Sequence, residues 1–192
     1  MKCIILAGGF GTRLRSITGD QIPKCMAKGM FRPGTRDVPW LEIIIRQLKK
    51  QGITDITLAL HYKAEVFTEW FGDKLKYKIE DRPLGTGGAI RNCIEGNEPV
   101  LVLNGDTYAK CDFNDMLAKH ISPLTVAVTQ NKGYMTSAGV YIISPELFNK
   151  APKSAFSFET FIMPMQKKFY IIEWFGDMGS PEGYEEVKAV VE

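Results

Sequence analysis

A glycine-rich stretch runs into a basic residue near the start of the chain, in the sequence IILAGGFGTR. Gly8, Gly9 and Gly11 have no side chains and tolerate φ above zero, so a ligand can approach the backbone N–H groups closely. Thr12 adds a hydroxyl, and the guanidinium of Arg13 can bind two phosphate oxygens at once. These residue types suit a polyphosphate, although a tight strand–helix turn with a solvated arginine would use the same residues.

The spacing of these glycines excludes two other phosphate-binding motifs. A dinucleotide fingerprint needs a third glycine where this chain has Leu14, and an acidic residue near position 30, where it has Met30. A Walker loop needs a Gly-Lys-Ser/Thr ending, which does not follow here. A nicotinamide-dependent oxidoreductase is therefore disfavoured.

Two aspartates follow strongly apolar segments and are candidate metal ligands. Asp106 ends PVLVLNGD, and Asp177 comes after YIIEWF. Mg²⁺ prefers a few carboxylates together with phosphate oxygens and water, so two strand-end carboxylates can share one ion if their strands are neighbours. Nothing local in the sequence brings the two together, and we expect a shared metal to do so. Alternatively, Asp106 caps a turn and Asp177 binds the backbone of Gly179.

Strand and helix patterns alternate along the chain. Short apolar runs predict strands, and apolar residues at helical spacing predict helices between them. Strands are expected at 2–7, 54–60, 75–80, 99–106, 124–130, 138–144 and 169–175. Helices are expected at 39–52, 63–72, 86–95, 112–120, 144–151, 156–168, with a bend near Pro164, and 180–191. The alternation predicts a three-layer α/β fold with a mostly parallel sheet, a central first strand, and any antiparallel addition between 124 and 144.

Composition places the chain among soluble globular proteins. Its 192 residues suit one domain, 1–192, and the net charge of +2 with no basic block predicts neither a nucleic-acid nor a membrane partner. No secretory signal or membrane-spanning run is recognised. The four cysteines are widely spaced, which is typical of buried thiols in a reducing, cytoplasmic location.

Five ordered motifs resemble those of the sugar-1-phosphate nucleotidylyltransferases. LAGGFGTRL…PKCM is similar to the family signature, in which proline usually replaces the cysteine. The other four, in the family's order, are PLGTGGAI at 83–90, VLNGDTY at 102–108, SAGVYIIS at 137–144 and FGDMGSPEGY at 175–184. The resemblance covers most of the chain and implies a Rossmann-like nucleotidyltransferase fold with a mixed, mostly parallel sheet.

The resemblance also implies a reaction and a set of site residues. A nucleoside triphosphate and a sugar 1-phosphate would give an NDP-sugar and pyrophosphate, with Mg²⁺ as cofactor. Within the family, PLGTGGAI and the closing motif are most similar to heptose 1-phosphate guanylyltransferases, which implies GTP. The implied catalytic residues are Arg13, Lys24 and Asp106; the nucleotide-binding residues are Leu6, Ala7, Gly8, Gly9, Gly11, Thr12, Arg13, Gly85, Thr86 and Gly87; the sugar-binding residues are Asn104, Gly139 and Glu159; the metal ligands are Asp106 and Asp177.

Physical chemistry is consistent with these roles. Cations aimed at the phosphates screen the charge between two anionic reactants. Lys24 would then lie at the α-phosphate, unless it is a solvated loop lysine. The glycines at 85–88 lead into a helix, whose free N–H groups would face a flat base. Asn104 as a turn residue and Glu159 as a surface residue remain alternatives.

The chain also departs from the family. The segment between Met26 and Pro39 is longer than usual, and the hairpin after 124–129 is short and lacks the family's Glu-Lys-Pro, whose lysine holds the sugar phosphate. Lys132 is the only cation in that short loop. A non-catalytic nucleotide-binding module, or the same reaction with mannose or glucose 1-phosphate and another base, therefore remains an alternative. A homo-oligomer is possible.

Overall fold

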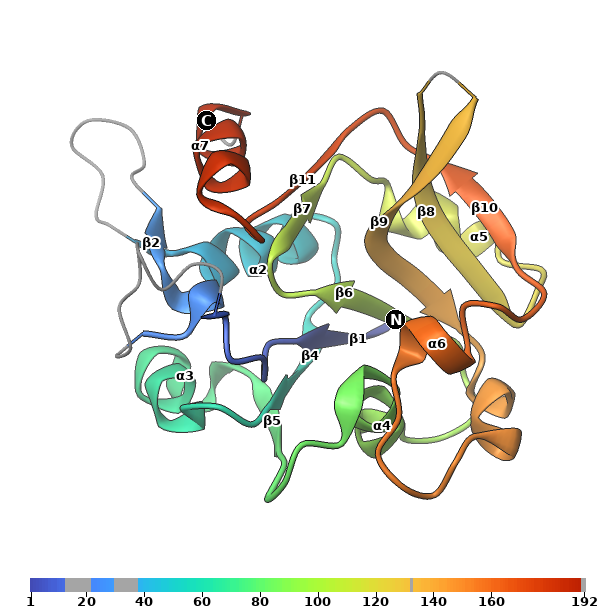
Figure 1. The fold of residues 1–192 in the computed structure, drawn as a ribbon, viewed down its shortest axis with the longest axis horizontal. Helices are drawn as coiled ribbons and strands as arrows, with labels where there is room; N and C mark the ends of the chain where they lie inside the picture. The colour runs from blue at the N-terminus through green and yellow to red at the C-terminus, as the bar shows by residue number, and fades with distance from the viewer. Residues whose placement is uncertain (13–21, 30–37, 132, 191–192) are drawn as a thin grey trace.

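A seven-stranded mixed sheet organises the chain. The computed structural model describes residues 1–12, 22–29, 38–131 and 133–190 (Figure 1). The strand order is β10-β8-β9-β6-β1-β4-β5, and the bounds are β1 Lys2–Leu6, β4 Asp55–Leu60, β5 Lys76–Ile79, β6 Val100–Asn104, β8 Leu124–Asn131, β9 Tyr134–Ile143 and β10 Lys168–Ile171. β1 is parallel to both of its neighbours, β6 and β4, so the predicted interior position of the first strand is confirmed.

The antiparallel part of the sheet is β9, which pairs antiparallel with both β6 and β8. It falls within the predicted window. The helices are α2 Trp40–Lys50, α3 Ala64–Phe71, α4 Gly85–Cys93, α5 Phe113–Ala118, α6 Phe158–Phe161 and α7 Pro181–Val190, with 3₁₀ helices at Lys24–Met26, Gly72–Lys74 and Pro145–Lys150. α2, α3 and α5 pack on one face of the sheet, and α4 and α6 pack on the other. The predicted three-layer α/β fold is confirmed. No helix in the described ranges is both long and apolar enough to cross a membrane.

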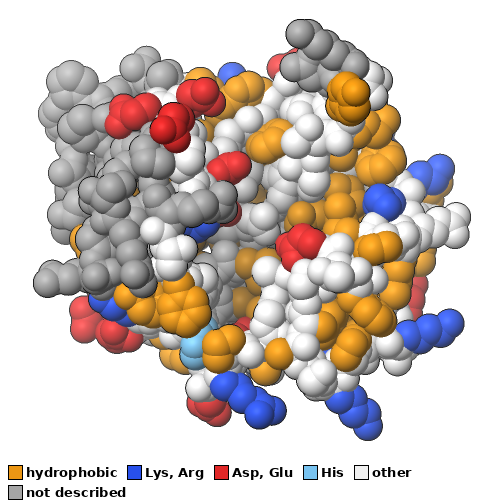
Figure 2. Space-filling model, in the orientation of Figure 1, with side chains coloured by type: hydrophobic (Ala, Val, Ile, Leu, Met, Phe, Trp, Pro, Cys, Tyr) orange, Lys and Arg blue, Asp and Glu red, His pale blue; other side chains and the backbone are white. Residues whose placement is uncertain are grey.

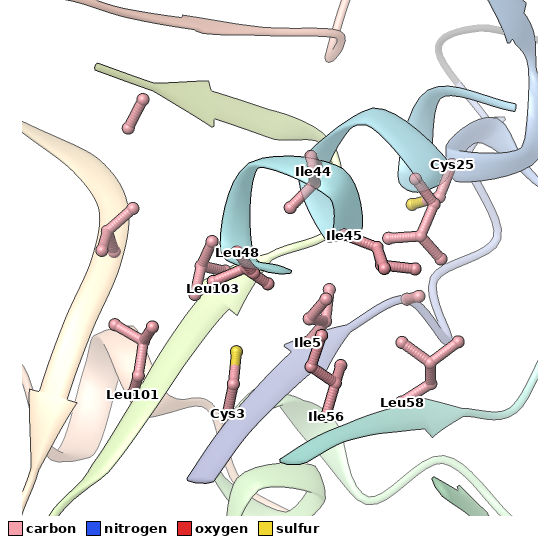
Figure 3. Close-up of a cluster of buried hydrophobic side chains, with 14 of the residues drawn as sticks. Cys3, Ile5, Cys25, Ile44, Ile45, Leu48, Ile56, Leu58, Leu101 and Leu103 are labelled. Atoms are coloured by element: carbon pink, nitrogen blue, oxygen red, sulfur yellow. The ribbon is translucent and has the colours of Figure 1, made fainter. Parts of the chain in front are cut away.

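The larger core lies between α2 and the central strands. Ile44, Ile45 and Leu48 of α2 face the side chains of β1, β4 and β6 (Figure 3). Along β1, Ile5 belongs to this core and Ile4 to the core on the opposite face, because successive side chains of a strand point to opposite sides. Burial on both faces explains why the strand is a continuous apolar run.

All four cysteines are free and buried, as the sequence predicts. Burial raises the pKa of Cys25, Cys93 and Cys111 to about 12, so these thiols stay neutral at physiological pH.

The predicted last strand, 169–175, was wrong as one element. It forms two strands in two sheets: β10 pairs with β8, whereas β11 (Phe175–Asp177) pairs antiparallel with β7 (Thr107–Ala109), which we did not predict. The Ile172 N–H makes a ladder hydrogen bond to the Val128 carbonyl before the strand structure breaks. An apolar run predicts extended backbone, but it does not indicate where the pairing partner changes.

Two other predictions were too helical. Residues 145–150 form a 3₁₀ helix, and the 156–168 segment is α-helical only over α6. Pro164 has no N–H to continue the helical hydrogen bonds, so a long helix cannot run through it. The predicted N-cap of α5 is confirmed, since Asp112 accepts hydrogen bonds from the backbone N–H groups of Asn114 and Asp115. The short strands β2 (Lys28–Gly29) and β3 (Val38–Pro39) were not predicted.

Candidate active site

A cavity of about 360 Å³ opens at the carboxyl ends of β1, β4 and β6. Parallel strands bring their carboxyl ends to one edge of a sheet, where ligands of α/β proteins bind. Figure 2 shows this face hollowed near its middle, with charged side chains beside the hollow. The lining residues are Leu6, Ala7, Gly8, Gly9, Phe10, Lys24, Cys25, Ala59, His61, Glu80, Pro83, Gly85, Thr86, Ala89, Asn104, Asp106 and Glu159. Most of the site residues predicted from the sequence therefore line one cavity. The predicted residues that do not line it are Gly11, Thr12, Gly87, Gly139 and Asp177. Arg13 lies outside the described residues.

The glycines of the first turn have different functions. Among the described residues, no atom apart from those of its chain neighbours lies within 4 Å of where a Cβ of Gly9 would be, so this glycine leaves open space at the cavity. A Cβ on Gly8 would lie 2.8 Å from the backbone nitrogen of His61. Gly11 has a φ of +62°, and its Cβ would lie 2.9 Å from the Cβ of Lys24. Gly9 gives room for a ligand, whereas Gly8 and Gly11 allow close packing within the chain.

Lys24 and Asp106 form an ion pair inside the cavity. The Lys24 Nζ donates a hydrogen bond to Asp106 Oδ2, and the side chains are 18% and 19% exposed. Lys24 begins a 3₁₀ helix after Pro23, and Asp106 follows β6. Although the two are 82 residues apart in sequence, the folded chain makes them partners. A cation and a carboxylate at a strand end can bind a phosphate and a metal ion, respectively.

Asp177 is brought next to Asp106 by backbone pairing. In the β7–β11 ladder, Asp177 lies opposite Thr107, and the Met178 N–H donates to the Asp106 carbonyl over 2.8 Å. The expectation that only a metal would join the two aspartates was therefore wrong, because the sheet does so. The Asp177 Oδ1 accepts a hydrogen bond from the Gly179 N–H, which is the alternative role that the sequence left open.

The donor set of these aspartates fits Mg²⁺. In the part of the chain that the structure describes, no group of three or more His, Cys, Asp or Glu side chains is placed to hold a metal. Asp106 pairs with Lys24 through Oδ2, and its Oδ1 accepts a long hydrogen bond from the Thr107 hydroxyl, over 3.5 Å, whereas Asp177 accepts from Gly179 through Oδ1. Two carboxylates, with the other positions left to phosphate and water, make the environment that Mg²⁺ prefers.

The first turn of α4 is packed against the chain and is not open. We expected free N–H groups here, but those of Gly87 and Gly88 donate to the Phe156 carbonyl, over 3.0 and 3.4 Å. A Cβ on Gly87 would lie 2.2 Å from the Phe156 ring, so this glycine permits close contact with the segment before α6. Gly85 and Thr86 are the residues of this turn that line the cavity.

Thr86, a predicted nucleotide-binding residue, contacts Glu159, a predicted sugar-binding residue. The Thr86 Oγ1 donates a hydrogen bond to Glu159 Oε2 over 2.6 Å. The Glu159 Oε2 also accepts a hydrogen bond from the Ser157 hydroxyl. Glu159 is thus held in a fixed position at the cavity wall.

Asn104 also lines the cavity, and Gly139 packs against it. Gly139 has a φ of +65°, and a Cβ on Gly139 would lie 2.7 Å from the Asn104 Nδ2.

Seven lining residues were not among the predicted site residues, and Phe10, His61 and Glu80 carry the aromatic or carboxylate side chains among them. Phe10 is 51% exposed, and its ring packs against the rings of His61 and Tyr62, with centroids 6.0 and 5.2 Å apart. The His61 Nδ1 makes a hydrogen bond with the Glu80 carbonyl, and the Glu80 carboxylate accepts the Leu84 N–H. Glu80 is the last residue of the predicted strand 75–80 and His61 follows the predicted strand 54–60, so a search for polar residues at or just after the end of every predicted strand would have found both.

Comparison with known proteins identifies the family of the chain. Residues 2–132 match the nucleotidyl transferase family. The chain belongs to the nucleotidyl transferase family. It is 36% identical to D-glycero-alpha-D-manno-heptose 1-phosphate guanylyltransferase from Campylobacter jejuni over 223 residues, covering 96% of this chain and 97% of the relative. The enzyme of the same name from Aneurinibacillus thermoaerophilus is 33% identical over 230 residues, covering 98% and 97%. The crystal structure of HddC from Yersinia pseudotuberculosis complexed with GMP-PN has a TM-score of 0.82 and 29% identity, covering 100% of this chain and 99% of that one.

The alignments to the two guanylyltransferases contain gaps in this chain. The alignment to the Campylobacter protein spans 223 positions, more than the 192 residues of this chain, so the relative carries residues that this chain lacks. The hairpin that the sequence predicts to be short is the β8–β9 hairpin, in which β8 runs to Asn131 and β9 starts at Tyr134, with Gly133 at a φ of +85°. Lys132, the cation considered there, lies outside the described residues.

Proposed function

We propose that this nucleotidyl transferase joins GTP to a heptose 1-phosphate, giving a GDP-heptose and pyrophosphate. The observation that carries the proposal is the Lys24–Asp106 pair in a cavity at the carboxyl ends of parallel strands. The base and sugar follow the names of the two relatives that match nearly the whole chain. In the reaction, an oxygen of the sugar phosphate attacks the α-phosphorus of GTP, and the bond from that phosphorus to pyrophosphate breaks.

The main task of the protein is to bring two anions together. Lys24 supplies a positive charge that is four-fifths buried, where screening by water is weak. We assign it to the α-phosphate, where charge builds during the attack. Arg13 is assigned to the outer phosphates on the strength of the family motif and the glycine-rich turn before it. Gly9, which leaves open space, permits the triphosphate to approach the backbone.

Asp106 and Asp177 are proposed to hold Mg²⁺. When bound, Mg²⁺ would neutralise phosphate charge and orient the oxygens. Asp106 accepts a hydrogen bond from Lys24, so it would have to exchange this partner in order to hold Mg²⁺, and Lys24 would then be available to a phosphate. We expect the two carboxylates to approach within about 5–6 Å, because each metal–oxygen bond spans roughly 2.1 Å.

Glu80 supports the choice of guanine. A carboxylate only accepts hydrogen bonds, and the Watson–Crick edge of guanine offers N–H donors at N1 and N2. Glu80 lines the cavity, and one oxygen of its carboxylate accepts the Leu84 N–H. Its other oxygen is then suited to the base, and Phe10 nearby offers an aromatic face. Glu159, held by Thr86 and Ser157, is assigned to sugar hydroxyls.

The experiment is pyrophosphate release with GTP, ATP, CTP, UTP and dTTP against heptose, mannose and glucose 1-phosphates, with and without Mg²⁺. We expect the highest kcat/KM for GTP with heptose 1-phosphate. The Glu80→Gln variant should lose preference for GTP while the other nucleotides change little. A preference for mannose 1-phosphate would support the next candidate, since mannose-1-phosphate guanyltransferase from Pichia angusta is 28% identical over 96% of this chain. Tight GTP binding with no pyrophosphate from any pair would support the non-catalytic alternative.

A further inference from the structure

The Thr86 hydroxyl has no proton left for a nucleotide. A threonine hydroxyl has one hydrogen to donate and two lone pairs that accept. The Thr86 Oγ1 donates to Glu159 Oε2 over 2.6 Å and accepts a hydrogen bond from the Phe158 N–H over 2.9 Å. Phosphate oxygens and base carbonyls accept hydrogen bonds, so they would need that single proton. Although Thr86 lines the cavity, its hydroxyl is therefore committed to the segment that contains Glu159.

Two hydroxyls hold the same oxygen of the Glu159 carboxylate. The Ser157 Oγ also donates to Glu159 Oε2, over 2.8 Å. The Ser157 hydroxyl in turn accepts hydrogen bonds from the backbone N–H and the hydroxyl of Thr160, each over 3.1 Å. Within the described ranges, Glu159 Oε1 has no hydrogen-bond partner. Because Glu159 lines the cavity and a carboxylate oxygen accepts hydrogen bonds, Oε1 is the oxygen left for a ligand.

Backbone contacts join α4 to the segment before α6 without the Thr86 side chain. The Phe156 N–H donates to the Leu84 carbonyl over 2.9 Å, and the Phe156 carbonyl accepts the Gly87 N–H over 3.0 Å. Phe158, the first residue of α6, is fully buried in the core on this face of the sheet. Figure 1 shows α6 next to α4. Loss of the Thr86 hydroxyl should therefore free the carboxylate without separating the two segments.

Positioning in advance matters because Glu159 is an exposed residue. Without the two hydroxyl contacts, its side chain would sample several rotamers and would have to be ordered when a ligand binds. For a glutamate, that loss of freedom corresponds to about a tenfold factor in Kd. Holding the carboxylate in one orientation beforehand removes this cost from binding.

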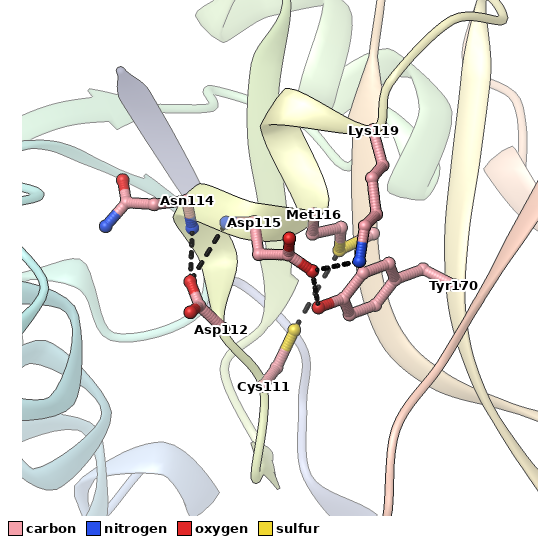
Figure 4. A network of polar contacts seen from close by, with 7 residues as sticks. All are labelled: Cys111, Asp112, Asn114, Asp115, Met116, Lys119 and Tyr170. Atoms are coloured by element: carbon pink, nitrogen blue, oxygen red, sulfur yellow. Dashed lines mark hydrogen bonds and ion pairs between the residues drawn. The ribbon is translucent and has the colours of Figure 1, made fainter.

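A similar hydroxyl–carboxylate contact lies on the other face of the sheet and provides a control. The Tyr170 hydroxyl donates to Asp115 Oδ2 of α5 over 2.6 Å, and the Lys119 ammonium pairs with the same oxygen over 2.7 Å (Figure 4). Neither Tyr170 nor Asp115 lines the cavity. Removing the Tyr170 hydroxyl therefore breaks the same kind of hydrogen bond away from any ligand in the cavity.

We propose that Thr86 is a positioning residue for Glu159 and acts in sugar recognition, not in nucleotide binding. Together with Ser157, it holds Glu159 Oε2 so that Oε1 accepts a hydrogen bond from a hydroxyl of the sugar. The inference rests on the proposed function, which assigns the sugar to Glu159. It changes the role that the family resemblance implies for Thr86.

The test is the affinity for GDP-D-glycero-α-D-manno-heptose and for GDP, measured by isothermal titration calorimetry with Mg²⁺ present. The two ligands share the nucleotide and differ in the sugar. Thr86→Val keeps the shape of the side chain and removes the hydroxyl, so the Kd of the GDP-heptose should rise about tenfold, and that of GDP by less than about twofold. Thr86→Ser should restore the wild-type affinity. Tyr170→Phe should change neither Kd.

A double-mutant cycle tests whether Thr86 acts through Glu159. Glu159→Ala should by itself weaken binding of the GDP-heptose and leave GDP unchanged. Adding Thr86→Val to Glu159→Ala should cause no further loss, because the group that Thr86 positions is then absent. Additive losses would overturn the proposal, since they would mean that Thr86 contributes independently of Glu159.

Two further outcomes overturn the proposal. Equal weakening of GDP and the GDP-heptose in Thr86→Val would make Thr86 a nucleotide ligand. A wild-type protein that binds the GDP-heptose no more tightly than GDP would remove the sugar from Glu159.

Thermal unfolding of each variant checks that the fold is retained. If Thr86→Val does not fold, Ser157→Ala decides, because it removes the other donor to Glu159 Oε2 and should weaken only the GDP-heptose. These measurements need no turnover. A protein that shows the expected Kd pattern but releases no pyrophosphate would refute the proposed reaction and leave the role of Thr86 standing.

Discussion

Replacing Asp106 with asparagine separates the proposed chemistry from the fold. Asparagine keeps the shape of the side chain and removes its charge, so Lys24 loses its ion partner and the proposed Mg²⁺ loses a ligand. We expect turnover to fall by at least about a hundredfold, because removal of one preorganised group at developing phosphate charge commonly costs that much.

The expected loss of stability is small and follows from the exposure of the pair. Exposed ion pairs contribute about 0–1 kcal/mol, and breaking a fully buried pair costs roughly 3–5 kcal/mol. Since about a fifth of each side chain is exposed, and asparagine can still accept a hydrogen bond from Lys24, we expect a cost of about 1–2 kcal/mol. In a chain of this size, that corresponds to a decrease of roughly 2–8 °C in Tm.

The assays are Mg²⁺-dependent pyrophosphate release and thermal unfolding, measured on the same preparation. The matched control is Asp55→Asn, which also removes a lysine-paired carboxylate, here with Lys76 at 2.7 Å and far from the cavity. The control should keep its turnover. If Asp106→Asn kept a rate within a few-fold of the wild type, the assignment of Asp106 to the reaction would be wrong, and a Tm decrease far beyond this range would mean that its role is structural.

Three further predictions concern the cavity and the fold. Gly9→Ala should raise the KM for GTP several-fold with little change in Tm. Gly8→Ala should lower Tm, because its Cβ would lie 2.8 Å from the backbone nitrogen of His61. The reverse pattern would contradict the assignment of Gly9 to ligand space and of Gly8 to packing within the chain. Lys24→Ala and Arg13→Ala should each reduce kcat/KM by about a hundredfold or more while the protein remains folded, and near-native rates in both would refute the triphosphate assignment. Burial lowers the pKa of His120, so the folded state binds fewer protons than the unfolded state as the pH falls below about 6.5, and stability should decrease there. Chemical denaturation at pH 7 and pH 5 should show a smaller difference in His120→Asn, and an unchanged difference would exclude this histidine as the cause.

Local sequence determined the elements of the central sheet. Apolar runs predicted β1, β4 and β6, since a strand buried on both faces has few polar positions, and helical spacing predicted α2. The carboxyl ends of these strands then indicated where the cavity would be, because the parallel arrangement leaves one edge for ligands. Lys24 and Asp106 were both predicted as site residues, from the family motif and from their place in the chain.

Tertiary packing decided which residues meet. The Lys24–Asp106 pair, the Glu80 carboxylate at the cavity and the Phe156 carbonyl on the first turn of α4 join segments far apart in the chain. The division of 169–175 between two sheets likewise depends on where β8 and β7 lie. Backbone propensity is local, whereas a hydrogen-bond partner is chosen by the position of a distant segment. The sequence therefore determined that Asp106 and Asp177 follow apolar strands, and only the folded chain, through the β7–β11 hydrogen bonds, made them neighbours.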